Sequence, residues 1–264
     1  MEGVADTTTG LMERPLEHTI QEAQRITEAA AAAGISLKLL GGPGVFLHSP
    51  SAQHPPLKRK YGDLDFAASS RQRKQLGAFF TGLGYEANER FNTLQGDRRL
   101  CFWDVSLPRQ VDVFLDALKM SHFIDLRRRL ELEGPCASPT DLLISKLQIY
   151  ELNQKDVVDL VALLLDHSVA DHEGDVINGA HVAGLTADDW GLYRTFQVNT
   201  ERIRAAVQDL NVRREVVNER LDDLWLRIGA RPKSMRWRLR AQVGDRARWY
   251  ELPEEVRSPY EPIW

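Results

Sequence analysis

Two aspartates, Asp63 and Asp65, stand one residue apart in the otherwise apolar run of residues 63–68, DLDFAA. In a β-strand the side chains of residues i and i+2 project to the same face, so both carboxylates face one side while Leu64 and Phe66 face the other. Adjacent carboxylates repel one another and raise each other's pKa unless a cation neutralises them. The pattern therefore predicts a sheet with one apolar face and one face that receives a charged ligand.

A third carboxylate, Asp112, lies in the alternating segment 110–116, QVDVFLD. If its strand lies beside the first, three aspartates converge on one edge of the sheet. Magnesium prefers oxygen ligands and keeps waters and substrate phosphates in its shell, and such an edge suits two-metal phosphoryl transfer. The Asp-x-Asp pattern alone is short, and taken by itself it more often marks a solvated strand end.

A diglycine, Gly41-Gly42, follows a short strand expected at residues 35–40 and precedes a short helix expected around residues 45–47. Such a corner leaves backbone N–H groups available to phosphate oxygens. Taken alone, two glycines indicate only a turn. The order strand, diglycine, helix, strand with two aspartates and strand with a third is far more specific.

The remaining pattern predicts a mixed α/β chain that becomes all-helical after about residue 120. Residues 49–61 are expected to form a polar loop, and the Gly- and Asp-rich residues 168–187 a linker. Helices are expected at 15–33, 69–83, 121–132, 139–152, 155–167, 188–209, 212–229 and 233–243, and strands at 35–40, 63–68, 85–90, 98–105 and 110–116.

The segments LLGGPGVFLH, RKYGDLDFA and QVDVFLD resemble the nucleotidyltransferase superfamily of the DNA polymerase β type. The pattern of that family is hG[GS], then Dh[DE]h, then a third acidic residue on a strand. Residues 138–167 are similar to the branch that contains AbiEii-type toxins and the minimal and aminoglycoside nucleotidyltransferases, in which an LLxxK helix precedes KDxxDL. The resemblance covers roughly residues 15–167, with no comparable match over residues 188–264.

This resemblance implies an α/β (α+β) fold, a nucleotidyltransferase-type mixed sheet flanked by helices and followed by a C-terminal helical domain. The implied organisation is a disordered leader at 1–14, a catalytic domain at 15–135, a helical extension closing the active site at 136–167, a linker at 168–187 and a C-terminal helical domain with a basic tail at 188–264.

The resemblance also implies roles for particular residues. Asp63, Asp65 and Asp112 would bind metal, two Mg²⁺ ions with Mn²⁺ as the alternative, and Asp112 would also act as the base or position the attacking hydroxyl. The NTP would be bound by Gly41, Gly42, Arg59, Lys146 and Asp159. Two of these have structural alternatives: Lys146 as a lysine extending from a core face, and Asp159 as an ordinary helix charge.

The chain departs from the family pattern at three places. Residues 49–61 lengthen the loop before the first aspartate, Pro43 removes one N–H that phosphate would use, and Tyr61 stands where a small Ser or Thr is common. These departures affect the expected nucleotide affinity and choice, and they leave the three aspartates in place.

The implied activity is transfer of an NMP from an NTP such as ATP to an acceptor hydroxyl, with release of pyrophosphate. The acceptor stays open: tRNA or another RNA for a toxin-like enzyme of a toxin–antitoxin pair, whose partner would be an antitoxin protein, or alternatively an aminoglycoside-like small molecule or a protein. A non-catalytic nucleotide-binding protein with the same fold is the third alternative.

Residues 231–250 combine seven Lys or Arg residues with Trp237, Trp249 and Tyr250. Basic and aromatic side chains together suit a nucleic-acid backbone and stacked bases. The alternative is internal pairing of these arginines with acids such as Glu219, Asp222 and Asp223.

Composition sets the remaining expectations. The net charge of −4 excludes a globally basic nucleic-acid binder, so any basic surface is local. Two cysteines, Cys101 and Cys136, are expected as free thiols in a reducing cytosol. The polar start and the lack of an 18-residue apolar run predict a cytoplasmic protein with no signal peptide and no membrane span. The histidines His167, His172 and His181 are expected in a solvated loop.

Overall fold

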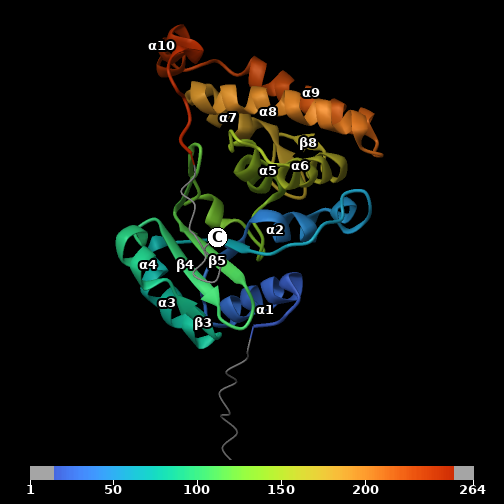
Figure 1. Ribbon diagram of the computed structural model, residues 1–264. Coiled ribbons are helices and arrows are strands. Elements are labelled where there is room, and N and C mark those ends of the chain that lie inside the picture. The colour runs from blue at the N-terminus through green and yellow to red at the C-terminus, as the bar shows by residue number, and fades with distance from the viewer. Residues whose placement is uncertain (1–14, 253–264) are drawn as a thin grey trace, which may run out of the picture.

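The computed structural model describes residues 15–252 and shows an α/β half below a helical half (Figure 1). The expected leader, residues 1–14, lies outside the described residues, as do residues 253–264 of the expected basic tail. The strands are β1 (Leu37–Leu39), β2 (Leu64–Ala68), β3 (Tyr85–Ala87), β4 (Arg99–Asp104), β5 (Arg109–Leu115), β6 (Ala117–Lys119), β7 (Phe123–Asp125), β8 (Val169–Ala170) and β9 (Ile177–Asn178). The helices are α1 (Thr19–Ala32), α2 (Gly41–His48), α3 (Arg73–Gly82), α4 (Glu89–Gln95), α5 (Pro139–Leu147), α6 (Gln154–Asp166), α7 (Gly179–Asp188), α8 (Trp190–Asp209), α9 (Arg214–Ala230) and α10 (Met235–Val243).

The central sheet has five strands in the order β1-β2-β5-β4-β3. Strands β2 and β5 are parallel, and the other neighbouring pairs are antiparallel. The fold is therefore the expected mixed sheet flanked by helices.

Alternation along the strands gives this sheet two different faces. The face that carries Leu64 and Phe66 of β2 and Val111 and Val113 of β5 is buried against α1 and α3 in one apolar core. That core includes Phe80 stacked on Phe102, with ring centroids 4.6 Å apart. The opposite face of β2 and β5 carries Asp65, Asp112 and Phe114, and it is turned toward the helical half.

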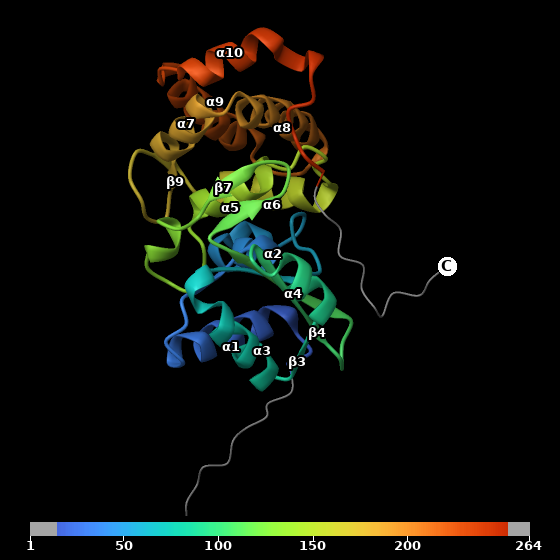
Figure 2. The ribbon, with the colours of Figure 1, turned by 90° about the vertical axis from the view of Figure 1, so that its left-hand side faces the viewer.

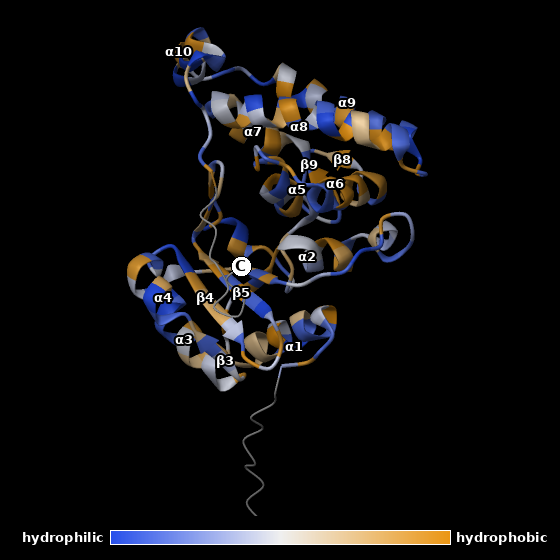
Figure 3. Cartoon of the chain, in the orientation of Figure 1, coloured by the Kyte–Doolittle hydropathy of each residue, from blue (hydrophilic) through white to orange (hydrophobic). Residues whose placement is uncertain are grey.

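Helices α2, α5 and α6 lie between the sheet and the upper helices α7, α8 and α9 (Figure 2). Their apolar sides form a second core that runs from Val45 of α2 through Leu160 of α6 to Leu224 of α9. Hydrophobic residues accordingly line the inner sides of these helices, and hydrophilic residues alternate with them outside (Figure 3). Helix α2 contributes to both cores, with Val45 in the second and Leu47 packed against the first.

Residues 121–132 do not form the expected helix. Strands β6 and β7 make an antiparallel hairpin there, with Leu118 opposite Ile124 and both side chains buried. The residue between β5 and β6, Asp116, has a φ of +61°, which turns the chain sharply into the hairpin. Because the buried positions Ile124 and Leu126 are spaced by two, the segment follows the strand period.

Two other elements are shorter than expected. The strand predicted at 85–90 ends at Ala87, and Asn88 then caps α4 by accepting a hydrogen bond from the N–H of Phe91. The helix predicted at 139–152 ends at Leu147, because the side-chain amide of Asn199 binds the carbonyl oxygens of Leu147 and Ile149.

The interpretation of residues 168–187 as a linker is wrong. Strands β8 and β9 pair there, and α7 packs against α9. His167, expected in a solvated loop, is buried beside Asp175, with 3.1 Å between its Nδ1 and the carboxylate. His172 is exposed, as expected. Both cysteines are free thiols: Cys101 is buried and Cys136 partly buried. None of the helices within residues 15–252 has the length and apolar character that crossing a membrane requires.

Candidate active site

Asp65 and Asp112 are direct neighbours on parallel strands, because β2 and β5 pair in a register that places their Cα atoms opposite each other. Neighbouring positions of a parallel pair project to the same face. Asp112 is 4% exposed, and Asp65 is partly exposed. Asp63, just before β2, is exposed and near enough for its charge to act on Asp65. The structure thus brings the predicted aspartates to one edge of the sheet.

The Asp65 carboxyl has an unusual acidity. Burial, followed by the nearby charge of Asp112, raises its pKa from 3.8 to about 7. Arg99 and Lys146 act in the opposite direction, and Asp63 adds a small further increase. A cation near Asp65 would therefore strongly stabilise the ionised form of its carboxyl group.

Gly41 brings the backbone against these carboxylates. Its φ of +62° is in the left-handed region, and a Cβ atom there would lie 2.5 Å from Oδ2 of Asp65. Gly41 and Gly42 were both expected to bind the NTP, but Gly42 does not face the cavity. It is buried beneath Arg59 and Tyr61, and a Cβ atom on it would lie 2.0 Å from the Arg59 guanidinium. Only Gly41 of this pair reaches the cavity described next.

A cavity of about 600 Å³ lies between the open face of the sheet and the ends of α5 and α6. Its walls combine acidic, basic and apolar groups. They comprise Leu40, Gly41, Asp65, Phe114, Leu118, Met120, Ser145, Lys146, Ile149, Glu151, Asn153, Asp156 and Leu252. A cavity of this size with few converging charged groups is typical of a small-ligand site.

Lys146 lines this cavity opposite Asp65, and it is bound by two carboxylates. Its Nζ lies 2.8 Å from Asp156 and 2.8 Å from Asp159. Burial alone would lower the pKa of Lys146, but Asp159 and Asp156 outweigh it and raise the pKa, so the ammonium stays charged. Arg59 also binds Asp159 through two nitrogens, at 2.8 and 2.6 Å. Arg59 and Asp159, expected at the nucleotide, pair with each other beside the cavity wall.

Arg99 of β4 is a site residue that the sequence patterns did not reveal. Its Nε and Nη2 nitrogens bind the two oxygens of Asp112 at 2.8 and 2.6 Å. Gln110 donates a further hydrogen bond to Asp112 at 2.6 Å. The sequence offered one signal for Arg99, a basic residue at the start of the apolar run RLCFW. Arg99 stands two residues before Cys101, and Cys101 lies opposite Asp112 in the sheet.

The donor set partly fits the metal that the resemblance implies. Asp65 and Asp63 present carboxylate oxygens, which magnesium prefers, and the raised pKa of Asp65 marks a position that a cation would stabilise. Asp112, in contrast, is engaged by Arg99. Within residues 15–252 no three His, Cys, Asp or Glu side chains are grouped closely enough to ligate one ion.

Gly41→Ala is expected to weaken both folding and nucleotide binding. The left-handed φ costs an alanine roughly 1–2 kcal/mol, and its methyl group would displace the Asp65 carboxylate. Urea unfolding and NTP titration by calorimetry measure the two effects. The matched control is Gly77→Ala within α3, where the added methyl meets no atom within 4 Å and should stabilise by roughly 0.5–1 kcal/mol. Equal effects of the two substitutions would contradict the assigned role of Gly41.

Comparisons with known proteins give the following result. No protein-family model matches the chain, and no curated protein matches it. Among solved structures, the lincosamide antibiotic adenylyltransferase LnuA has a TM-score of 0.42 at 15% identity, covering 55% of this chain and 96% of its own. The antibiotic-resistance factor ANT(2'')-Ia has a TM-score of 0.39 at 12% identity, covering 72% and 95%. A nucleotidyltransferase-like protein from Paracoccidioides brasiliensis has a TM-score of 0.40 at 12% identity, covering 84% and 96%.

Proposed function

We propose that the protein is a metal-dependent nucleotidyltransferase, which moves an NMP from an NTP to an acceptor hydroxyl and releases pyrophosphate. The observation that carries the proposal is the pairing of Asp65 with Asp112 on the open face of the sheet, directly against the Gly41 corner. The charged Lys146 lies across the same cavity.

Each group has a chemical task in this proposal. The backbone at Gly41 and the ammonium of Lys146 bind and orient the triphosphate. Asp65 and Asp63 would hold a divalent cation, which supplies neutralisation of the phosphate charge. Asp112 accepts a hydrogen bond from the acceptor hydroxyl and aligns it for in-line attack. Positioning and charge neutralisation then account for the catalysis.

The acceptor site is a second cavity of about 530 Å³, which shares Phe114, Met120 and Leu252 with the first. A third cavity, of about 620 Å³, shares Lys119, Phe123 and Glu251 with the second. The second and third cavities therefore continue from Phe114 and Arg99 across the β6–β7 hairpin toward α10. Phe123 on this hairpin is 63% exposed.

Aromatic and basic side chains line the third cavity. They include Trp190, Trp237, Trp249 and Tyr250, with Lys119, Arg236, Arg240 and Arg248. Faces of this kind bind stacked bases and phosphates, so we favour an RNA acceptor. An aminoglycoside is cationic and requires a predominantly acidic site, whereas this cavity has four cations and three acids, Asp188, Asp189 and Glu251.

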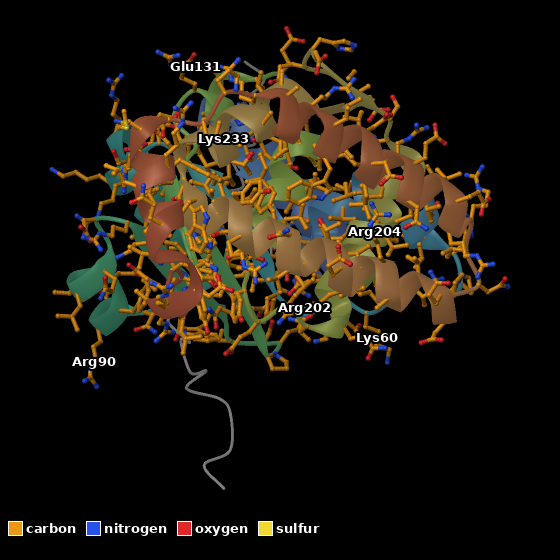
Figure 4. The ribbon with its side chains drawn as sticks, turned by 90° about the horizontal axis from the view of Figure 1, so that it is seen from above. Lys60, Arg90, Glu131, Arg202, Arg204 and Lys233 are labelled. Carbon is orange, nitrogen blue, oxygen red and sulfur yellow. The ribbon has the colours of Figure 1, made fainter. Side chains whose placement is uncertain are left out.

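Some of the cations of residues 231–250 make contacts within the molecule. Arg240 stacks on Trp190 and Arg248 on Tyr250, at 4.6 and 4.8 Å. The acids suggested as its partners bind elsewhere: Asp222 pairs with Arg204 and Glu219 with Arg220. Seen from above, Arg202 and Arg204 lie along the α8 side, apart from Lys233 near α10 (Figure 4).

The test is incubation of the full chain with each labelled NTP and Mg²⁺, in parallel with total RNA, a protein lysate and an aminoglycoside panel. We expect label in RNA, equimolar release of pyrophosphate, and no label with Asp65→Asn. Label in the antibiotic or protein arm would replace RNA as the acceptor. Absence of both label and NTP binding would reject the enzyme.

A further inference from the structure

Three apolar side chains lie where the first cavity, the proposed NTP site, meets the second cavity, the proposed acceptor site. Phe114 of β5, Met120 of the β6–β7 hairpin and Leu252 line both cavities. Within residues 15–252, no other residue lines both of them. The three side chains carry neither a charge nor a strong hydrogen-bonding group. We call these three residues the apolar boundary.

A hydrogen bond between backbones joins the chain at Met120 to the chain at Leu252. The N–H of Glu251 donates to the carbonyl oxygen of Ser121 at 3.0 Å. The Glu251 carboxylate also lies 3.4 Å from Nζ of Lys119. The two residues that come from the hairpin and from the end of the described chain are therefore held beside each other.

Residues 249–252 form a strap that descends from α10 toward the sheet (Figure 1). The Tyr250 ring stacks on Tyr150, with ring centroids 3.7 Å apart and 16° between the two planes. The indole N–H of Trp249 donates a hydrogen bond to the Thr195 hydroxyl of α8 at 3.2 Å. The strap is thus anchored on the helical half immediately before it reaches the apolar boundary.

The chemistry of transfer makes this boundary important. An attacking oxygen must approach the α-phosphorus opposite the leaving pyrophosphate, so it arrives from the acceptor side. Water can attack in the same way: its oxygen bonds to the α-phosphorus, the bond to the bridging oxygen breaks, and pyrophosphate leaves. The products are then NMP, pyrophosphate and a proton released to solvent. An ordered water needs two or more polar partners, which apolar side chains do not provide.

We propose that Phe114, Met120 and Leu252 exclude water from the α-phosphate, so that the enzyme transfers the NMP to its acceptor instead of hydrolysing the NTP. Leu252 is the member of the boundary that depends most on its anchor, because it is 51% exposed whereas Phe114 is 5% exposed. This inference rests on the proposed function and adds to it a selectivity against water.

The test is the rate of NMP release by the full-length chain from each labelled NTP, with Mg²⁺ and without any acceptor. We expect slow release by the wild type, release roughly tenfold faster by Leu252→Ala and an intermediate rate for Leu252→Val, because the gap grows as the side chain shrinks. The dissociation constant of the NTP, measured by calorimetry, should change much less than this rate. A general loss of structure would instead weaken binding.

The matched control is Leu239→Ala on α10, which makes the same chemical change at a side chain of similar exposure. Leu239 is 58% exposed and lines none of the three cavities, so NMP release should stay as slow as in the wild type. Tyr250→Ala leaves the boundary residues in place but removes their anchor, and it should also accelerate NMP release.

An unchanged rate in Leu252→Ala, or a wild type that releases NMP as fast as this variant, would overturn the inference. Circular dichroism shows whether Leu252→Ala is folded, and Leu252→Val takes its place if it is not. The two proposals fail separately. Labelled acceptor with an unchanged rate in Leu252→Ala rejects the boundary alone, and faster NMP release without any labelled acceptor rejects transfer alone. No NMP release and no labelled acceptor reject both.

Discussion

Asp65→Asn is expected to lower nucleotidyl transfer by roughly 10³-fold while making the folded protein more stable above pH 7. Activity falls because the amide no longer offers the negative oxygens that face the cavity at the Gly41 corner. Stability rises because the wild-type carboxylate is ionised at high pH in a position where burial and Asp112 oppose its charge. The substitution is therefore expected to lower activity and raise stability at the same time, which separates the two roles of Asp65.

The pH dependence follows from the direction of the shift. The folded protein holds the Asp65 proton up to a pKa of about 7, whereas the unfolded chain releases it near 3.8. Stabilisation by this group is complete below pH 3.8 and is lost as the pH rises to about 7, at about 1.4 kcal/mol per pH unit and roughly 4 kcal/mol in all. Urea unfolding at pH 5 and pH 8 should show about 3 kcal/mol of this loss in the wild type, because the two pH units from 5 to 7 lie between them, and none of it in Asp65→Asn.

Asp112→Asn is the matched control for Asp65→Asn, because it makes the same chemical change on the neighbouring strand. It removes the carboxylate that Arg99 binds through two nitrogens, so it should destabilise the fold at pH 8. The prediction for Asp65 is wrong if Asp65→Asn also destabilises at pH 8.

The parts of the site that were predictable are those that depend on local alternation. The period of two in residues 63–68 and 110–116 indicates which aspartates share a face, because strand geometry fixes side-chain direction within a few residues. The diglycine before α2 likewise indicates a turn beside them. These local rules led to Asp65 and Gly41, which line one cavity, and to Asp112, which lies beside Asp65 on the neighbouring strand.

The parts that were not predictable depend on partners far along the chain. Arg59 contacts Asp159 across 100 residues, and this contact covers Gly42 with a guanidinium. The α5 helix ends where Asn199 binds its carbonyl oxygens. The hairpin at residues 117–125 shows the same limit, since its apolar content suits a helix until pairing with a neighbouring strand is known.

Asp159→Asn is expected to be among the most destabilising single substitutions in the chain. Asp159 is 1% exposed, and its carboxylate binds both Arg59 and Lys146. An amide is neutral and cannot accept in the same way from two cations, so Arg59 and Lys146 would keep only part of their compensation in a poorly hydrated position. Removing one member of a buried ionic group costs roughly 3–5 kcal/mol. Urea unfolding at pH 7 measures the loss.

The matched control for Asp159→Asn is Asp222→Asn, which breaks an ion pair of similar length on the surface. Asp222 binds Arg204 at 2.6 Å with a side chain that is 72% exposed, so its loss should cost no more than about 1 kcal/mol. Equal costs for the two variants would show that Asp159 does not organise a buried network. Arg59 binds Asp159 and also covers Gly42, so Asp159→Asn should loosen the loop around residues 58–61 and increase its proteolytic cleavage in the folded state, whereas Asp222→Asn should not.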